Sequence, residues 1–153
     1  MSQLSENFHL REFTKSTIAD MRGIVLSPDS RQIANIKHLC WEILEPIRIL
    51  FDDKPIIITS GFRSEALNKI VGGSERSHHL AYEGYAACDF VIHGLDPVDI
   101  TKRIIESDIK FHQVIACAKD GESGFVHVSS FRNKQEALKK LSSGRYIRFA
   151  HRP

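Results

Sequence analysis

Apolar residues recur at steps of three and four between residues 28 and 50, which is the spacing of one face of an α-helix. Ser27-Pro28 has the pattern of a helix N-cap followed by proline in the first turn. Pro46 falls inside the periodic stretch and predicts a kink, because proline has no backbone N–H to donate. We expect a long amphipathic scaffold helix whose inward positions are Ile33, Ile36, Cys40, Ile43, Leu44, Ile47 and Leu50.

Short apolar and β-branched runs bounded by turn residues predict strands. Only a few residues separate the third run from the fourth, so these two should form an antiparallel hairpin around the turn Lys119–Glu122. A fifth, weaker run near the C-terminus is a possible edge strand. The five runs are Ile56–Ser60, Ala86–Ile92, Gln113–Ala118, Phe125–Ser129 and Tyr146–Phe149.

Three shorter helices complete the pattern, and apolar residues near the N-terminus (Phe8, Leu10, Phe13) should anchor the opening segment to the core. The helices are expected at Ser64–Val71, from Asp96-Pro97 to near Asp108, and at Glu136–Leu141. Because helices and strands do not alternate strictly, the sequence predicts an α+β fold with helices packed on a mainly antiparallel sheet. A chain of 153 residues fits a single domain spanning residues 1–153.

The amino-acid composition argues against several classes of function. The net charge is only +2, which offers no basic footprint for nucleic acid. Three cysteines without CxxC spacing (Cys40, Cys88, Cys117) favour buried free thiols and synthesis in a reducing compartment. The N-terminus shows no signal peptide, and no apolar run approaches the ~20 residues that span a bilayer. We therefore expect a protein made in the cytoplasm, with neither membrane insertion nor nucleic-acid partners.

Three residues have the character of metal ligands. Asp89 directly precedes the apolar pair Phe90-Val91, where an unpaired carboxylate would be costly to bury. His127 alternates with Val126 and Val128, so its side chain should point away from the core face. With His79 in the preceding loop, two imidazoles and one carboxylate make up a ligand set that suits catalytic zinc.

Several blocks of the sequence resemble those of the zinc D-Ala-D-Ala carboxypeptidase family, and of its small single-domain phage and bacterial branch in particular. The resemblance implies a hedgehog/D-Ala-D-Ala peptidase-like fold, a zinc ion, and peptidoglycan stem peptides as substrate. The blocks are Ser60-Gly61-Phe62-Arg63-Ser64, Leu67-Asn68, Val71-Gly72-Gly73-Ser74, Ser77-His78-His79-Leu80, Ala86-Ala87-Cys88-Asp89-Phe90 and Val126-His127-Val128-Ser129.

The resemblance also implies a role for each matching residue. His79, Asp89 and His127 correspond to the three zinc ligands. Arg63 corresponds to an arginine to which the resemblance assigns the terminal carboxylate of the substrate, which a planar guanidinium holds through two parallel hydrogen bonds. Ser77 is expected to help hold the substrate peptide.

The chain departs from the family's pattern in the spacing of its first two ligands. Asp89 follows His79 by ten residues, three more than the family's usual spacing. The extra residues must bulge within Ala81–Tyr85 if Asp89 is to reach the metal. Using His78 as the ligand would widen the gap further, so His79 is preferred.

The general base is the second departure. Related enzymes place an acidic residue shortly before the last histidine, often at the position that is Gly124 here. Glu122 is the first candidate base and Asp120 the second, while Cys117 occupies a place on the preceding strand where this branch can carry an acid. These departures keep a rival open, a non-catalytic wall-binding or virion structural module. With no signal peptide, access to the wall would come through holin-type release or as part of a virion.

Overall fold

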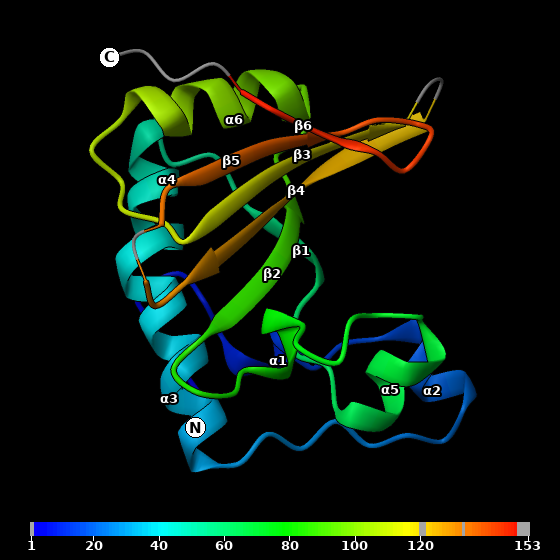
Figure 1. The fold of residues 1–153 in the computed structure, drawn as a ribbon. Helices are drawn as coiled ribbons and strands as arrows, with labels where there is room; N and C mark the ends of the chain where they lie inside the picture. The colour runs from blue at the N-terminus through cyan, green and yellow to red at the C-terminus, as the bar shows by residue number, and fades with distance from the viewer. Residues whose placement is uncertain (1, 120–121, 133, 150–153) are drawn as a thin grey trace.

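The computed structural model describes residues 2–119, 122–132 and 134–149. Helices and strands form an α+β arrangement around one mixed sheet (Figure 1). The helices are α1 (Leu10–Phe13), α2 (Thr17–Met21), α3 (Ser30–Leu39), α4 (Glu45–Leu50), α5 (Glu65–Ile70) and α6 (Pro97–Glu106), with a π-helical segment at Cys40–Leu44 and a 3-10 turn at His78–Leu80.

The sheet follows the order β1-β2-β4-β3-β5-β6, and all pairs are antiparallel except β3–β5. Its β3–β4 hairpin and its edge strand β6 confirm the pattern expected from the sequence. The strands are β1 (Ile57–Ser60), β2 (Ala86–Val91), β3 (Gln113–Lys119), β4 (Glu122–Ser130), β5 (Glu136–Lys140) and β6 (Tyr146–Arg148).

The long scaffold helix is present, and its regular α-helical hydrogen bonding is interrupted next to the proline. A π-helical segment ends one residue before Glu45-Pro46 and joins α3 to α4. The wider turn fits a proline that cannot donate to the ladder. The helix begins later than expected, however. Asp29, not Ser27, is the N-cap, because its carboxylate accepts from the N–H of Gln32 and the Gln32 side chain accepts in return from Asp29.

The segment expected as a short helix, Glu136–Leu141, is instead strand β5. Its residues favour a helix on propensity alone, but pairing alongside β3 leaves Ala137 fully buried within the core. Tertiary packing therefore overrides local preference here. The correction matters for the site, because β5 extends the sheet beside β3.

The two faces of the sheet have different partners. The face carrying Phe90, Val126 and Val128, all with 0% exposure, packs on the scaffold helices and α6. Figure 1 shows α3, α4 and α6 gathered on one side of the sheet. Because side chains alternate along a strand, Asp89 and His127 face the other side. That second face supports the candidate site.

The N-terminal segment is fixed to the core as expected. Phe8 and Phe13 are buried, and Leu10 packs beside them. Ser16 caps α2 by accepting from the N–H of Ala19. The backbone N–H of Phe62 donates to the carbonyl of Phe13 at 2.7 Å, which joins this segment to the end of β1.

Candidate metal centre

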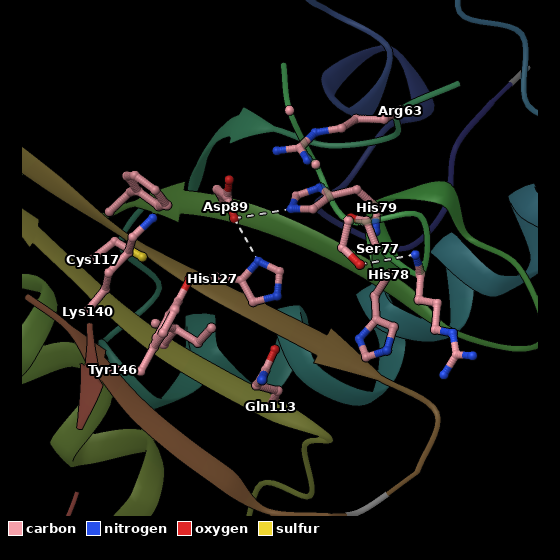
Figure 2. A pocket seen from close by; sticks show the side chains of 16 residues that line it. Arg63, Ser77, His78, His79, Asp89, Gln113, Cys117, His127, Lys140 and Tyr146 are labelled. Atoms are coloured by element: carbon pink, nitrogen blue, oxygen red, sulfur yellow. Dashed lines mark hydrogen bonds and ion pairs between the residues drawn. The ribbon is translucent and has the colours of Figure 1, made fainter. Parts of the chain in front are cut away.

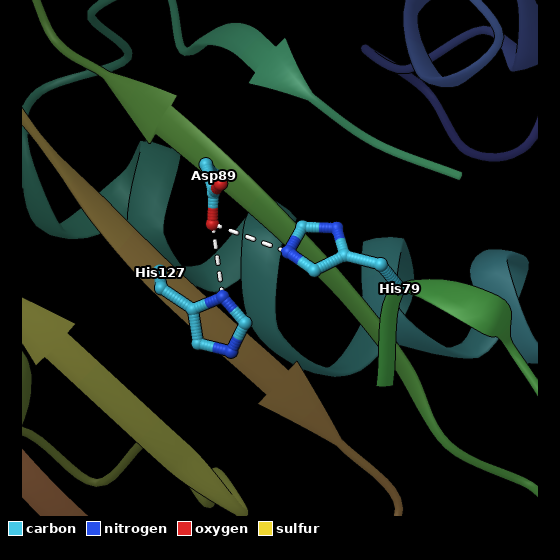
Figure 3. A group of neighbouring side chains, drawn as sticks. All are labelled: His79, Asp89 and His127. Carbon is cyan, nitrogen blue, oxygen red and sulfur yellow. Dashed lines mark hydrogen bonds and ion pairs between the residues drawn. The ribbon is translucent and has the colours of Figure 1, made fainter. Parts of the chain in front are cut away.

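His79, Asp89 and His127 meet on the open face of the sheet. One ligand atom from each lies within 4.8 Å of the others. Oδ1 of Asp89 is 2.9 Å from Nδ1 of His127 and 3.4 Å from Nε2 of His79. Figure 3 shows both rings directed at the same carboxylate oxygen. We refer to these three residues as the trio.

Strand register accounts for two members of the trio. Asp89 on β2 is paired directly with His127 on β4, so their side chains project from the same face of the sheet. His79 comes from a different element, the 3-10 turn, where Ser77 Oγ accepts the N–H of His79. The turn therefore places His79 next to Asp89 and His127, which the strand pairing has already aligned.

A carbonyl group fixes the orientation of the His79 ring. Nδ1 of His79 lies 2.7 Å from the carbonyl oxygen of Gly61. Since a carbonyl can only accept, Nδ1 carries the proton, and Nε2 is left with its lone pair facing Asp89. This outer contact is typical of histidines that bind metals. His78, by contrast, stacks on Tyr85 with ring centroids 4.3 Å apart.

The extra residues before Asp89 are absorbed by a tight loop, as the sequence required. Ala81 and Glu83 adopt left-handed backbone conformations, with φ of 57° and 56°. Two side chains of α3 hold the start of the loop: Gln32 donates to the carbonyl of Leu80 and Asn35 to that of Ala81. The added length therefore stays within the loop, and Asp89 reaches His79.

The ionisation of Asp89 and His79 suits metal binding at neutral pH. Burial would raise the pKa of Asp89, but the hydrogen bond with His127 and the adjacent His79 ring hold it well below its usual range. Burial lowers the pKa of His79, although Asp89 opposes that shift. The centre therefore presents a carboxylate and a neutral imidazole, both in the form that a metal requires.

Zinc fits the donors that the structure brings together. Two imidazole nitrogens and one carboxylate oxygen form a set used by catalytic zinc sites, which keep a fourth position for water. A buried carboxylate between two histidines, one of them held by a carbonyl, also has the outer support of such sites.

A cavity of about 440 Å³ opens over the trio. Arg63 and Ser77, the two expected substrate contacts, both line it (Figure 2). Residues from β3, β4, β5 and β6 form the sheet side of the wall. These include Gln113, Ile115, Cys117, Phe125, Lys140 and Tyr146.

Arg63 is half-buried at the edge of this cavity. Burial lowers the pKa of its guanidinium, and the nearby Asp89 carboxylate opposes that shift. Its backbone N–H donates to the carbonyl of His79, and Nη1 donates to Asn68 Oδ1 at 3.3 Å. Within the described part of the chain no carboxylate forms an ion pair with Arg63, so the rest of its donors remain available to a ligand.

The candidate bases lie largely outside the described residues. Asp120 falls in a gap of the description, and of Glu122 only the backbone is described, as the first residue of β4. Among the described residues that line the cavity, Asp89 is the only carboxylate. The assignment of the general base to Glu122 therefore stays a prediction.

The Peptidase M15 family profile matches residues 6–129. The chain belongs to the peptidase M15 family. M15 is a family of metallopeptidases, and the match is consistent with the D-Ala-D-Ala carboxypeptidases that the sequence blocks resemble. The α+β architecture is compatible with the M15 fold. A search of curated proteins found no significant match.

Some features of this M15 site could not be anticipated. The wall contributed by Lys140 and Tyr146 depends on β5 being a strand, which the local sequence does not indicate. The contact between Gly61 and His79 joins a backbone carbonyl to a ring eighteen residues away. Every residue has a backbone carbonyl, so the sequence does not indicate which one will contact the ring. No helix among the described residues is long and apolar enough to cross a membrane.

Acid should destabilise the metal-free protein. Burial lowers the pKa of His79 and, with the neighbouring histidines, lowers that of His78 to about 4, whereas unfolded histidine titrates near 6.5. Below about pH 6.5 the unfolded chain therefore binds more protons, and the free energy of unfolding falls as pH decreases toward 4. Denaturant titrations in EDTA at several pH values measure this slope.

The H78Q variant provides the comparison. Removing one of the two titrating rings should make the pH slope shallower without abolishing it. A free energy of unfolding that stays constant between pH 7.5 and 5 in the wild-type protein would contradict the buried neutral state of these histidines.

Proposed function

We propose that the chain is a zinc-dependent hydrolase of peptidoglycan stem peptides. The observation that carries the proposal is the trio, whose three ligand atoms lie within 4.8 Å of one another at the floor of a cavity. Membership of the M15 metallopeptidases supports hydrolysis of a peptide bond, and the match of the sequence blocks to D-Ala-D-Ala carboxypeptidases supports the stem peptide as substrate.

Each part of the centre has a role in this chemistry. His79, Asp89 and His127 would hold the zinc ion. When bound, zinc polarises the scissile carbonyl and lowers the pKa of a water molecule toward ~7. The Gly61 carbonyl keeps the Nε2 lone pair of His79 pointing into the centre, so the ligand does not have to reorient on loading.

Arg63 and Ser77 would bind the substrate. The guanidinium of Arg63 lines the cavity with most of its donors unengaged by described residues, which suits a terminal carboxylate. Ser77 both caps the turn that carries His79 and borders the cavity, so a peptide touching it lies directly beside the trio.

Proton transfer is assigned to Glu122, with Asp120 as the alternative. The base would accept a proton from the attacking water and return it to the leaving amine. Glu122 lies five positions before His127 along β4, which places their Cα atoms about 17 Å apart at the usual rise per residue. Catalysis by Glu122 therefore requires its carboxylate to come closer to the metal centre than this spacing along the strand places it.

Metal analysis and product analysis together test the proposed function. Purified protein that has not met a chelator should contain about one zinc per chain. Incubation with purified peptidoglycan should release D-alanine or another stem-peptide fragment, and treatment with EDTA should stop the release. Protein that binds no zinc under these conditions would overturn the proposal.

A non-catalytic module is the second candidate. It is favoured by one observation, that Asp89 is the only carboxylate among the described residues of the cavity wall. Such a module would bind the cell wall or serve in a virion. Zinc at full occupancy combined with no cleavage of any stem peptide would favour the non-catalytic module over the hydrolase. A separate test concerns the general base: unchanged turnover in both the E122Q and the D120N variant would exclude both residues from that role.

The same proposal includes where the protein is made and how it reaches its substrate. A hydrolase of this kind would be made in the cytoplasm and would reach the wall after holin-type release or as part of a virion. Assays of lysis from within, with and without a co-expressed pore-forming protein, distinguish this route from action on wall fragments inside the cell.

Arg63 should matter only for substrates with a free terminal carboxylate. In R63K a compact ammonium replaces the two parallel donors, and we expect kcat/KM for such substrates to fall roughly tenfold to a hundredfold. The same peptides with an amidated C-terminus should lose little. Steady-state kinetics on both peptides measure the difference, and equal losses on the two would remove Arg63 from carboxylate recognition.

A further inference from the structure

One wall of the cavity comes from strands that follow the segment matched by the family profile. The match ends at residue 129, whereas Lys140 closes β5 and Tyr146 opens β6. Both side chains nevertheless line the cavity over the trio (Figure 2). This wall of the cavity therefore lies outside the segment that the family profile matches.

The sheet register places Lys140 on the same face as the trio. Lys140 is paired with Cys117 on β3, and Cys117 with Phe125 on β4, two residues from His127. On its other side Lys140 is paired with Tyr146, and its Nζ lies 5.7 Å from the centre of that ring. Figure 2 shows the lysine side chain running past Cys117 toward the trio.

The charges around the cavity are unbalanced. Its described lining contains three basic side chains, Arg63, Arg76 and Lys140, against the single carboxylate of Asp89. Asp89 is already engaged by the two histidines of the trio. Lys140 is exposed and forms no ion pair with any described residue, so its positive charge is available to a ligand.

A substrate with one carboxylate would leave part of this charge unused. Arg63 would bind a terminal carboxylate, whereas Lys140 belongs to a different element, β5. In Figure 2 the side chains of Arg63 and Lys140 lie on opposite sides of Asp89. The phenol of Tyr146 next to Lys140 provides a further donor for an oxygen anion. The two cations are therefore arranged for two separate anionic groups.

We propose that Lys140, supported by Tyr146, binds a second carboxylate of the substrate, on the opposite side of the trio from Arg63. This inference rests on the proposed hydrolase function and deepens it. The preferred substrate class is then a peptide with two carboxylates, one at its C-terminus and one on a side chain near the scissile bond. Lys140 is a specificity-determining residue and takes no part in bond cleavage.

The test compares two peptides and two lysines. The peptides are acetyl-Glu-D-Ala-D-Ala and acetyl-Gln-D-Ala-D-Ala, which differ only in the second carboxylate. The variants are K140M and its neighbour K139M, which removes the same charge from the opposite face of β5. Binding is measured by calorimetry on metal-free protein, and kcat/KM on zinc-loaded protein.

Wild-type protein and K139M should both prefer the glutamate peptide about tenfold, which corresponds to about 1.4 kcal/mol. K140M should bind the two peptides equally, and its melting temperature should match that of K139M. Retention of the preference in K140M, or its absence in the wild-type protein, would overturn the inference.

The two readouts keep this inference separate from the proposed function. A Lys140-dependent binding preference without any hydrolysis would sustain the second carboxylate site and refute the hydrolase. Hydrolysis of both peptides at equal rates, with equal affinities, would sustain the hydrolase and refute the role of Lys140.

Discussion

The D89N variant should lose its metal and its peptidase activity together. An asparagine keeps the shape of the side chain but removes the negative charge that two histidines face at 2.9 and 3.4 Å. We expect zinc content to fall from about one per chain to under about a tenth, and turnover to fall by about a thousandfold or more, because the ligand set is then incomplete. Elemental analysis and release of stem-peptide fragments measure the two effects.

The matched control is H93A, which removes an exposed histidine just after β2 and away from the trio. It should retain wild-type zinc content and turnover. Circular dichroism on both variants confirms that the fold persists. A D89N protein that is folded and still carries a full zinc complement would exclude Asp89 from the ligand set.

The G61A variant should lose both stability and metal affinity. A β-carbon at this position would lie 2.5 Å from the Cα of Phe13 and 2.7 Å from its carbonyl oxygen, and neither backbone atom can move aside easily. Overpacking of this kind costs about 1–3 kcal/mol of unfolding free energy. The shift also moves the Gly61 carbonyl that orients His79, so zinc should bind roughly tenfold to a hundredfold more weakly.

Denaturant unfolding of metal-free protein and zinc titration separate the two effects. G94A is the control, because Gly94 has a φ of 81° and open space around it. That variant should lose about 1 kcal/mol from backbone strain and keep its zinc affinity. Unchanged zinc affinity in G61A would show that the carbonyl contact does not position His79.

Asp89 and His127 could be predicted because each has a local pattern in the sequence, whereas His79 was assigned from the resemblance of its block to the family's pattern. Asp89 precedes an apolar pair, and His127 alternates with two valines, so the pleat alone determines which way each points. The fold class was predictable because the periodicities of α3 and β4 agree with their burial, and the apolar run at β2 is buried over almost its whole length.

The remainder of the site depends on contacts between distant segments. Glu136–Lys140 has the composition of a helix, and only its place beside β3 makes it a strand. Lys140 could not be assigned to the cavity without that pairing. The predicted start of the scaffold helix was wrong because Ser27 and Asp29 are both residue types that cap helices. The reciprocal hydrogen bonds between Asp29 and Gln32 decide between them.

The tethering of the loop before β2 has a practical consequence for protein engineering. Gln32 and Asn35 secure the carbonyls of Leu80 and Ala81, so changes in length beyond this point do not propagate back to His79. Downstream, β2 is held in register by β4 along its length. The exposed junction between Tyr82 and Glu83 is thus a candidate graft point, where a reporter or targeting peptide would be displayed near the candidate metal centre.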